Sequence, residues 1–422
     1  MAHLLQLLLV LTVIVAAAKL AGAASSRLGQ PAVFGEILVG LLLGPTALDL
    51  LGSSPFAPHV SPLGEPGPGL MPIVRDLADI GVILLMLVAG LETDLAQMRK
   101  VGHVALWSAA GGVVLPLAGG VAVAMAFGLP LLWQGVFIGT ILTATSVSIS
   151  AQTLLELGSV RTREGATILG AAVIDDVMGI ALLSLVIAFA RSNGSLNLAG
   201  VGMVLLRMAV YFACALAAAR ALPAIARWAD GLGVSQGLLA AVLVVAFVYA
   251  WAAEYLGGVA AITGAYLAGI VFGQTPLKSR IDAGIHPLTY SIFVPVFFVA
   301  IGLQANGRQL GGRIAFTAAV VLVAIVAKAI GAGGVARLAG FSRLEAVRVG
   351  VGMVSRGEVG LIVASYGLTH GIIGQDVFSA SVIMVLVTTM VTPPLLRLTF
   401  PRPSARPGRF VEETVAGPPQ EQ

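Results

Sequence analysis

The stretch AVIDDVMG at residues 172–179 places two acidic side chains, Asp175 and Asp176, in the middle of an apolar segment. That segment, residues 164–190, is long enough to cross a lipid bilayer as a helix. A carboxylate at the centre of a bilayer costs about 2.5 to 3.5 kcal/mol on insertion scales. Two adjacent carboxylates therefore need a compensating cation, for which the sequence offers Lys328 or an ion from solution.

The whole chain has the composition of an integral membrane protein. Of its 422 residues, 58% are hydrophobic and only 10% are charged, and the mean hydropathy is +0.99. These values lie far outside those of soluble globular proteins. The pI near 9.5 does not indicate nucleic-acid binding, because the basic residues are scattered through short loops. The single cysteine, Cys214, excludes an intrachain disulfide.

Apolar stretches separated by Gly, Pro and charged residues predict an all-α membrane protein with thirteen transmembrane helices. The expected spans lie near residues 3–24, 31–48, 73–92, 102–127, 131–155, 164–190, 199–222, 234–253, 258–274, 287–303, 312–337, 345–369 and 376–398. Residues 399–422, rich in Pro, Arg and Glu, are expected to form a disordered cytoplasmic tail.

The basic residues predict the orientation of these spans. Sixteen Lys and Arg residues fall in loops or the tail after odd-numbered spans, and four in loops after even-numbered spans. Because basic residues are retained on the cytoplasmic side, the N-terminus is expected outside the cell and the C-terminus in the cytoplasm. The first span could be read as a signal peptide, since Ala21-Gly22-Ala23 resembles a cleavage site. The absence of Lys and Arg before its apolar run favours a retained helix.

Two halves of the chain repeat weakly. Gly90-Leu91 at the end of the third span recurs as Gly302-Leu303 at the end of the tenth. The same spacing lays Thr143 over Ser355. We expect a first six-helix repeat at residues 1–190, a linker helix with its loops at 191–233, and a second repeat at 234–398. With seven spans per step, the two repeats must be inverted in the membrane.

The fifth and twelfth spans are interrupted by polar residues at their centres. The fifth carries Thr143-Ala144-Thr145-Ser146 and the twelfth Ser355-Arg356-Gly357-Glu358. Both are expected to be discontinuous helices that cross, since unwound backbone at membrane depth survives only where it lines a cavity or is buried in protein. Estimated span centres place these breaks, the two aspartates and Lys328 at one depth, where transporter sites lie.

These motifs resemble the NapA-like bacterial sodium/proton antiporters, within the second monovalent cation/proton antiporter family. The resemblance covers all thirteen spans, and the paired aspartates with a lysine are its specific part. At the position of Asp175-Asp176, Kef-like members usually carry Gln-Asp, and electroneutral sodium/proton exchangers usually carry Asn-Asp; this chain has neither pair. Kef-like members usually also carry a large C-terminal nucleotide-binding domain, which this sequence does not contain. The motifs are Val173-Ile174-Asp175-Asp176, Thr143-Ala144-Thr145-Ser146, Lys328 in VAKAIG at 326–331, Ser355-Arg356-Gly357-Glu358, and GEILVG at 35–40 with Gly44-Pro45.

The resemblance implies an elevator-type homodimer of the NhaA/NapA-like fold in the bacterial inner membrane, with a scaffold and a moving core. It makes Asp176 the Na⁺-binding carboxylate and Asp175 the partner of Lys328, with Thr145 and Ser146 supplying oxygens. It implies no cofactor and no enzymatic activity. Independently, Arg356 and Glu358 are interpreted as groups that neutralise the ends of half-helices. Glu36 and Asp79 are interpreted as local helix caps or funnel residues.

The residues also suggest a chemistry. Adjacent carboxylates on a helix point about 100° apart, so each can have its own partner. A buried carboxylate can exchange a proton for a cation, which makes binding competitive. With protons on Asp176 and Lys328 both displaced by Na⁺ or Li⁺, the hypothesis is an electrogenic exchange of two protons per Na⁺. The alternatives are K⁺/H⁺ exchange, a purely structural ion network, an intramembrane aspartyl protease and a channel.

Overall fold

The computed structural model describes residues 3–28, 30–53, 56, 69–129, 134–191, 198–304, 313–369 and 371–400. Within these ranges the chain is helical, with no strand. The elements are α1 (His3–Arg27), α2 (Ala32–Leu43), η1 (Leu50–Gly52), α3 (Met71–Glu92), α4 (Leu95–Ala126), α5 (Val136–Thr143), α6 (Val147–Glu156), α7 (Arg163–Arg191), α8 (Leu198–Ala219), α9 (Leu222–Asp230), α10 (Gly237–Ala252), η3 (Ala253–Gly257), α11 (Ala261–Gly273), α12 (Lys278–Leu288), η4 (Thr289–Phe293), α13 (Val294–Gln304), α14 (Ile314–Leu338), α15 (Arg343–Gly352), α16 (Glu358–Thr369) and α17 (Gln375–Thr399).

The observed helices follow the expected segments closely. Each of the thirteen expected spans contains a helix, and those at residues 131–155 and 345–369 each contain two. Among the described residues, nine helices are long and apolar enough to cross a membrane. Of the tail expected at 399–422, only Thr399 and Phe400 lie within the described residues. The helix α9 was not predicted, since its range was interpreted as the end of a span and a loop.

Large apolar side chains cover much of the outside of the molecule. Leu4 and Leu8 on α1, Met203 and Leu206 on α8, and Leu322 on α14 are all more than half exposed. A soluble protein rarely shows so much apolar surface, whereas a helix facing lipid does. The distribution of exposed side chains therefore agrees with the composition in indicating a membrane protein.

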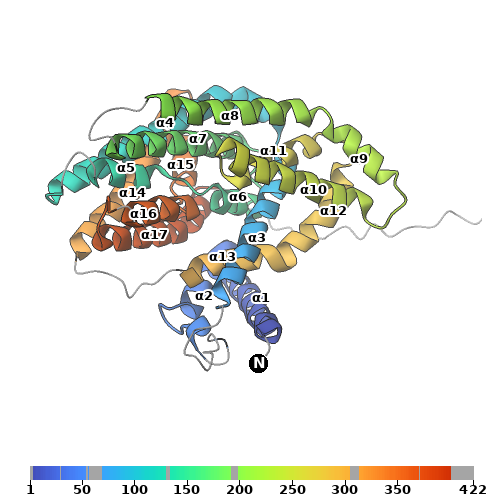
Figure 1. Cartoon of the computed structure of the whole chain (residues 1–422), viewed down its shortest axis with the longest axis horizontal. Helices are drawn as coiled ribbons and strands as arrows, with labels where there is room; N and C mark the ends of the chain where they lie inside the picture. Colours follow the sequence, from blue (N-terminus) through green and yellow to red (C-terminus); the bar gives the residue numbers. More distant parts are fainter. Residues whose placement is uncertain are drawn as a thin grey trace, which may run out of the picture.

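The helices form groups at the two ends of the molecule and between them (Figure 1). The helices α14, α15, α16 and α17 lie with α5 towards one end of the molecule, and α9, α10 and α12 towards the other. Helices α1, α2 and α13 pack on one another, and α3 packs on α11 and α6 between the two ends. The ion-site residues described below lie where α5, α7, α14 and the α15–α16 break meet.

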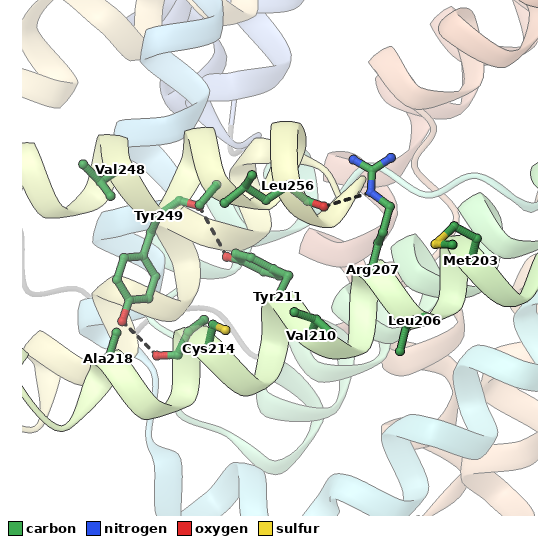
Figure 2. A pocket seen from close by; sticks show the side chains of 12 residues that line it. Met203, Leu206, Arg207, Val210, Tyr211, Cys214, Ala218, Val248, Tyr249 and Leu256 are labelled. Atoms are coloured by element: carbon green, nitrogen blue, oxygen red, sulfur yellow. Dashed lines mark hydrogen bonds between the residues drawn. The ribbon is translucent and has the colours of Figure 1, made fainter.

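Helix α8 is fixed to α10 and η3 by side chains that bond to backbone carbonyls (Figure 2). Tyr249 OH donates to Ala215 O at 2.9 Å, and Arg207 Nη2 and Nε donate to Tyr255 O at 2.8 Å and Leu256 O at 3.1 Å. Between the helices lies an apolar groove of about 520 Å³. Carbonyls freed where η3 ends thereby gain donors, as a helix end in an apolar environment requires.

Glycines allow α4 and α14 to cross closely. A Cβ on Gly331 of α14 would collide with the carbonyl oxygen of Gly111 on α4, and one on Gly111 with the carbonyl oxygen of Gly331. Small residues at such a crossing let backbones approach in membrane proteins. Gly331 is therefore required for this close approach, whereas a Cβ added at Gly334 would meet open space.

We predict that Gly331→Ala destabilises the protein and that Gly334→Ala does not. The added methyl of Gly331→Ala must push two backbones apart, at a cost of about 1–3 kcal/mol. In Gly334→Ala the same methyl meets nothing and adds up to about 1 kcal/mol of helix propensity. Thermal unfolding in detergent should show a lower midpoint for the first variant only. Equal midpoints for the two variants would contradict the packing described here.

Candidate ion-binding site

Two interrupted helices meet at the centre of the candidate site. Helix α5 ends at Thr143 and α6 begins at Val147, while α15 ends at Gly352 and α16 begins at Glu358. The interruptions expected in the fifth and twelfth spans are therefore present in the structure.

The two breaks are bonded to each other. Ser146 N–H donates to Ser355 O at 2.9 Å, and Ser355 Oγ donates to Ser146 O at 2.7 Å. Ser150 Oγ donates to Gly352 O at 2.5 Å. Gly357 has no side chain at a point where a Cβ would lie 2.7 Å from Ser146 Oγ. The unwound backbone thus satisfies part of its hydrogen bonding across the crossing, as buried polar groups must.

The positively charged guanidinium of Arg356 lies at the crossing of the two breaks. Its side chain is fully buried, and its Nε and Nη2 donate to Leu142 O at 3.1 and 2.7 Å. Nη2 also reaches Ala324 O at 3.0 Å, and Nη1 donates to Val354 O. Leu142 and Val354 lie at the ends of α5 and α15, where carbonyls lack helical partners and carry partial negative charge. The guanidinium therefore lies where it neutralises the ends of both half-helices.

Glu358 was predicted to share this role. Its backbone begins α16, but its side chain lies outside the described part of the chain.

Lys328 and Asp175 form a buried ion pair. Lys328 Nζ lies 2.8 Å from Asp175 Oδ1, and the two side chains are 0% and 2% exposed. The ammonium also donates to Thr143 O at 2.8 Å, at the end of α5. Breaking a buried pair by removing one partner leaves an uncompensated charge and is strongly destabilising. The pair therefore fixes α14 to α7 and to the first break.

Asp176 lies next to that pair but contacts a different part of the molecule. Its carboxylate is only 6% exposed, and Oδ2 accepts a hydrogen bond from Thr263 Oγ1 of α11 at 3.3 Å. The two aspartates thus have separate surroundings, as their adjacent positions on one helix predict. Thr263 was not among the residues predicted from the sequence. Its hydroxyl inside the apolar span 258–274 was the available signal, of the same kind as the hydroxyls that marked the break in the fifth span.

Thr145 and Ser146 are both buried in the first break. Thr145 Oγ1 is 3.5 Å from Thr143 O, the carbonyl that also accepts from Lys328. Ser146 Oγ is 3.1 Å from Ser148 Oγ. The structure therefore brings the predicted residues Thr145, Ser146, Arg356, Lys328 and Asp175 to one crossing, with Asp176 one residue further along α7.

The charges of the described side chains at this crossing balance when every one of these groups is ionised. Asp175 and Asp176 carry two negative charges, and Lys328 and Arg356 two positive charges, all within side chains that are at most 6% exposed. A cation that enters raises the net charge unless a proton leaves. Because uncompensated charge in a buried site is costly, the geometry favours exchange of a cation for protons over simple accumulation.

Comparisons with known proteins agree with this geometry. Residues 10–400 match the family model described as sodium/hydrogen exchanger, transmembrane. The Na(+)/H(+)-K(+) antiporter GerN of Bacillus cereus is 41% identical over 393 residues, covering 92% of this chain and 95% of its own length. A Na(+)/H(+) antiporter of Enterococcus hirae is 34% identical, covering 92% of this chain and 96% of its own length.

Solved structures show the same fold. A structure of the sodium proton antiporter MjNhaP1 from Methanocaldococcus jannaschii at pH 8 superposes with a TM-score of 0.64 at 16% identity, covering 94% of this chain and 97% of that chain. A further structure of the same antiporter gives a TM-score of 0.70 at 17% identity. Since the family model spans nearly the whole chain and relatives exceed 30% identity over most of it, this chain belongs to the sodium/hydrogen exchanger family of transmembrane antiporters.

Proposed function

We propose that this protein exchanges Na⁺ or Li⁺ from the cytoplasm for external protons, with Asp176 as the carboxylate that carries the ion. The supporting observation is the placement of a buried Asp176 beside a neutral Lys328–Asp175 pair at two crossed helix breaks. The names of two relatives, the Na(+)/H(+)-K(+) antiporter GerN and the Na(+)/H(+) antiporter of Enterococcus hirae, agree with this proposal.

Competition at Asp176 provides the coupling. A protonated Asp176 is neutral and has little attraction for a cation, whereas the ionised form can bind Na⁺ with help from the oxygens of Thr145 and Ser146. In both loaded forms a proton or a Na⁺ neutralises the charge of the Asp176 carboxylate itself, so both can pass the apolar barrier. The form with Asp176 ionised and neither ion on it keeps that carboxylate charged in apolar surroundings and is costlier to move, which opposes leakage of one ion without the other.

The charges at the crossing favour an electrogenic cycle with two protons per Na⁺. With protons on Asp176 and Lys328, the four ionisable groups carry a net charge of plus one. With Na⁺ bound and Lys328 neutral, they carry none. The two loaded forms differ by one charge, so the transmembrane potential acts on the cycle.

The remaining architecture of the proposal follows the sequence. It comprises thirteen spans in two inverted repeats, a NapA-like homodimer, an outside N-terminus and a cytoplasmic C-terminus. The core helices α5, α6, α15 and α16 would move as an elevator against a scaffold that includes α1, α2 and α10. Thr263 of α11 then touches Asp176 in only one position of the core.

Potassium is the second candidate ion. GerN is described as a Na(+)/H(+)-K(+) antiporter, and selectivity among alkali cations depends on small differences in cavity size and ligand number. The flux experiment below therefore tests Na⁺, Li⁺ and K⁺ separately.

We predict that Asp176→Asn abolishes cation-driven proton flux. Reconstituted vesicles loaded with a pH-sensitive dye should release protons on addition of Na⁺ or Li⁺ with the wild-type protein. The variant should respond no more than empty vesicles, because an amide cannot exchange a proton for a cation. Asp230→Asn is the matched control. Asp230 Oδ2 forms a salt bridge of 2.7 Å with Arg280 Nη1, and this pair is not part of the crossing. Flux that survives Asp176→Asn would defeat the site, and a response to K⁺ alone would favour the second candidate.

We also predict that the exchange responds to voltage through Lys328. In vesicles with an imposed potassium diffusion potential, the Na⁺ gradient at which proton flux reverses should shift with the voltage. The double variant Asp175→Asn/Lys328→Gln keeps a neutral hydrogen-bonded pair in place of the ion pair. Its remaining exchange should be one for one and independent of voltage. A wild-type reversal point that does not move with voltage would rule out the two-proton stoichiometry.

A further inference from the structure

A polar cavity lies apart from the crossing of the broken helices. It has a volume of about 840 Å³ and is lined by residues of α1, α2, α3, α6, α12, η4 and α13 and of the loop after α6. None of the residues at the ion site described above lines it. Its walls carry carboxylates and cations within an otherwise apolar protein, and the proposed exchange does not use them.

Glu156 connects two helices across this cavity. It is the last residue of α6, and its carboxylate accepts from the backbone N–H groups of Ala32 at 2.6 Å and Val33 at 3.3 Å, in the first turn of α2. Gln152 Nε2 also donates to it at 2.8 Å. These three donors fix the position of the Glu156 carboxyl group at the wall of the cavity.

Glu36 lies one turn further along α2 and has no such partners. Its side chain is only 6% exposed and lines the cavity, yet within the described residues no group donates a hydrogen bond to it. The nearby ammonium of Lys19 instead donates to Tyr290 O at 2.7 Å. Of the two interpretations of Glu36, the local helix cap is wrong, because the N-terminal donors of α2 bind Glu156. The position of Glu36 in the wall of the cavity agrees with the other, a funnel residue.

The charges around the cavity leave an excess of acid. Arg161 is paired with Glu92 at 2.6 Å. Lys19 then faces Glu36 and Glu156, which act on each other electrostatically. With all three groups ionised, this subgroup carries a net charge of minus one. Asp282 and His286 line another wall of the cavity. One monovalent cation would balance the subgroup, whereas a divalent cation would overshoot it.

We propose that Glu36 and Glu156 form a second binding site for a monovalent cation, separate from Asp176. Glu36 supplies an unpartnered buried carboxylate and Glu156 a fixed one, and the volume of the cavity leaves room for the cation to keep part of its water shell. The cation would lie at the far end of α6, the half-helix that begins at the ion-site break. Its occupancy would therefore act on the contact between α6 and α2.

Equilibrium binding of radioactive sodium to the purified full chain tests the proposal. Asp176→Asn should lose about half of the bound sodium, Glu36→Gln the other half, and the double variant all of it. Glu254→Gln is the matched control, because Glu254 is exposed and lies outside the cavity. It should bind as much as the wild type.

A second measurement guards against a variant that does not fold. Sodium chloride, compared with choline chloride at equal ionic strength, should raise the thermal unfolding midpoint of Asp176→Asn, since a ligand bound only to the folded state stabilises it. Glu36→Asp in that background should keep a smaller increase and Glu36→Gln none. Sodium binding and stabilisation that persist in Asp176→Asn/Glu36→Gln would overturn the second site. Proton flux in Asp176→Asn tests the proposed function separately.

Discussion

The ion pair between Lys328 and Asp175 is the interaction on which the rest of the structure depends. Both side chains are removed from solvent, and the ammonium also holds Thr143 O at the end of α5. If one partner were missing, the other charge would be buried without compensation, and no water is present at this depth to solvate it. The pair therefore ties α7 and α14 to the first break. Arg356 acts likewise on both breaks, through Leu142 O and Val354 O. The side chains of Lys328 and Arg356 thus donate to backbone carbonyls at the crossing of the two breaks.

Much of this architecture could be predicted from the sequence, because its causes are local. The length of the apolar segments predicts the helices. The breaks are marked by Thr143 to Ser146 and by Ser355 to Gly357, because runs of hydroxyl, glycine and charged residues oppose a continuous apolar helix. A lysine inside an apolar span needs an acidic partner, so a contact between Lys328 and an aspartate could be predicted. The contacts of Thr263 with Asp176 and of Glu156 with α2 could not be predicted, because they join residues far apart in the chain. Adjacent aspartates point in different directions, but only tertiary packing decides which of them faces Lys328.

The carboxylates of this protein differ in how their charge is compensated, and that difference separates structural from exchangeable groups. Asp175 and Glu156 are each held by short hydrogen bonds from fixed donors. Asp176 and Glu36 are nearly as deeply buried as Asp175. Asp176 accepts a hydrogen bond of 3.3 Å from a hydroxyl on α11, and Glu36 accepts none within the described chain. A buried carboxylate without such fixed donors must take up a proton or a cation. Both lie beside a firmly compensated acid, so occupancy can change without loss of the fold.

Proton release on sodium binding tests most directly the claim that a cation displaces protons from Asp176 and its neighbours. Sodium is titrated calorimetrically into the purified protein, at a pH where the empty site is protonated, in two buffers that differ in ionisation enthalpy. The account predicts that the observed heat depends on the buffer, with more than one proton released per Na⁺ bound, and that Asp176→Asn lowers this release. Identical heats in the two buffers would mean that Na⁺ binds without displacing protons and would contradict the account.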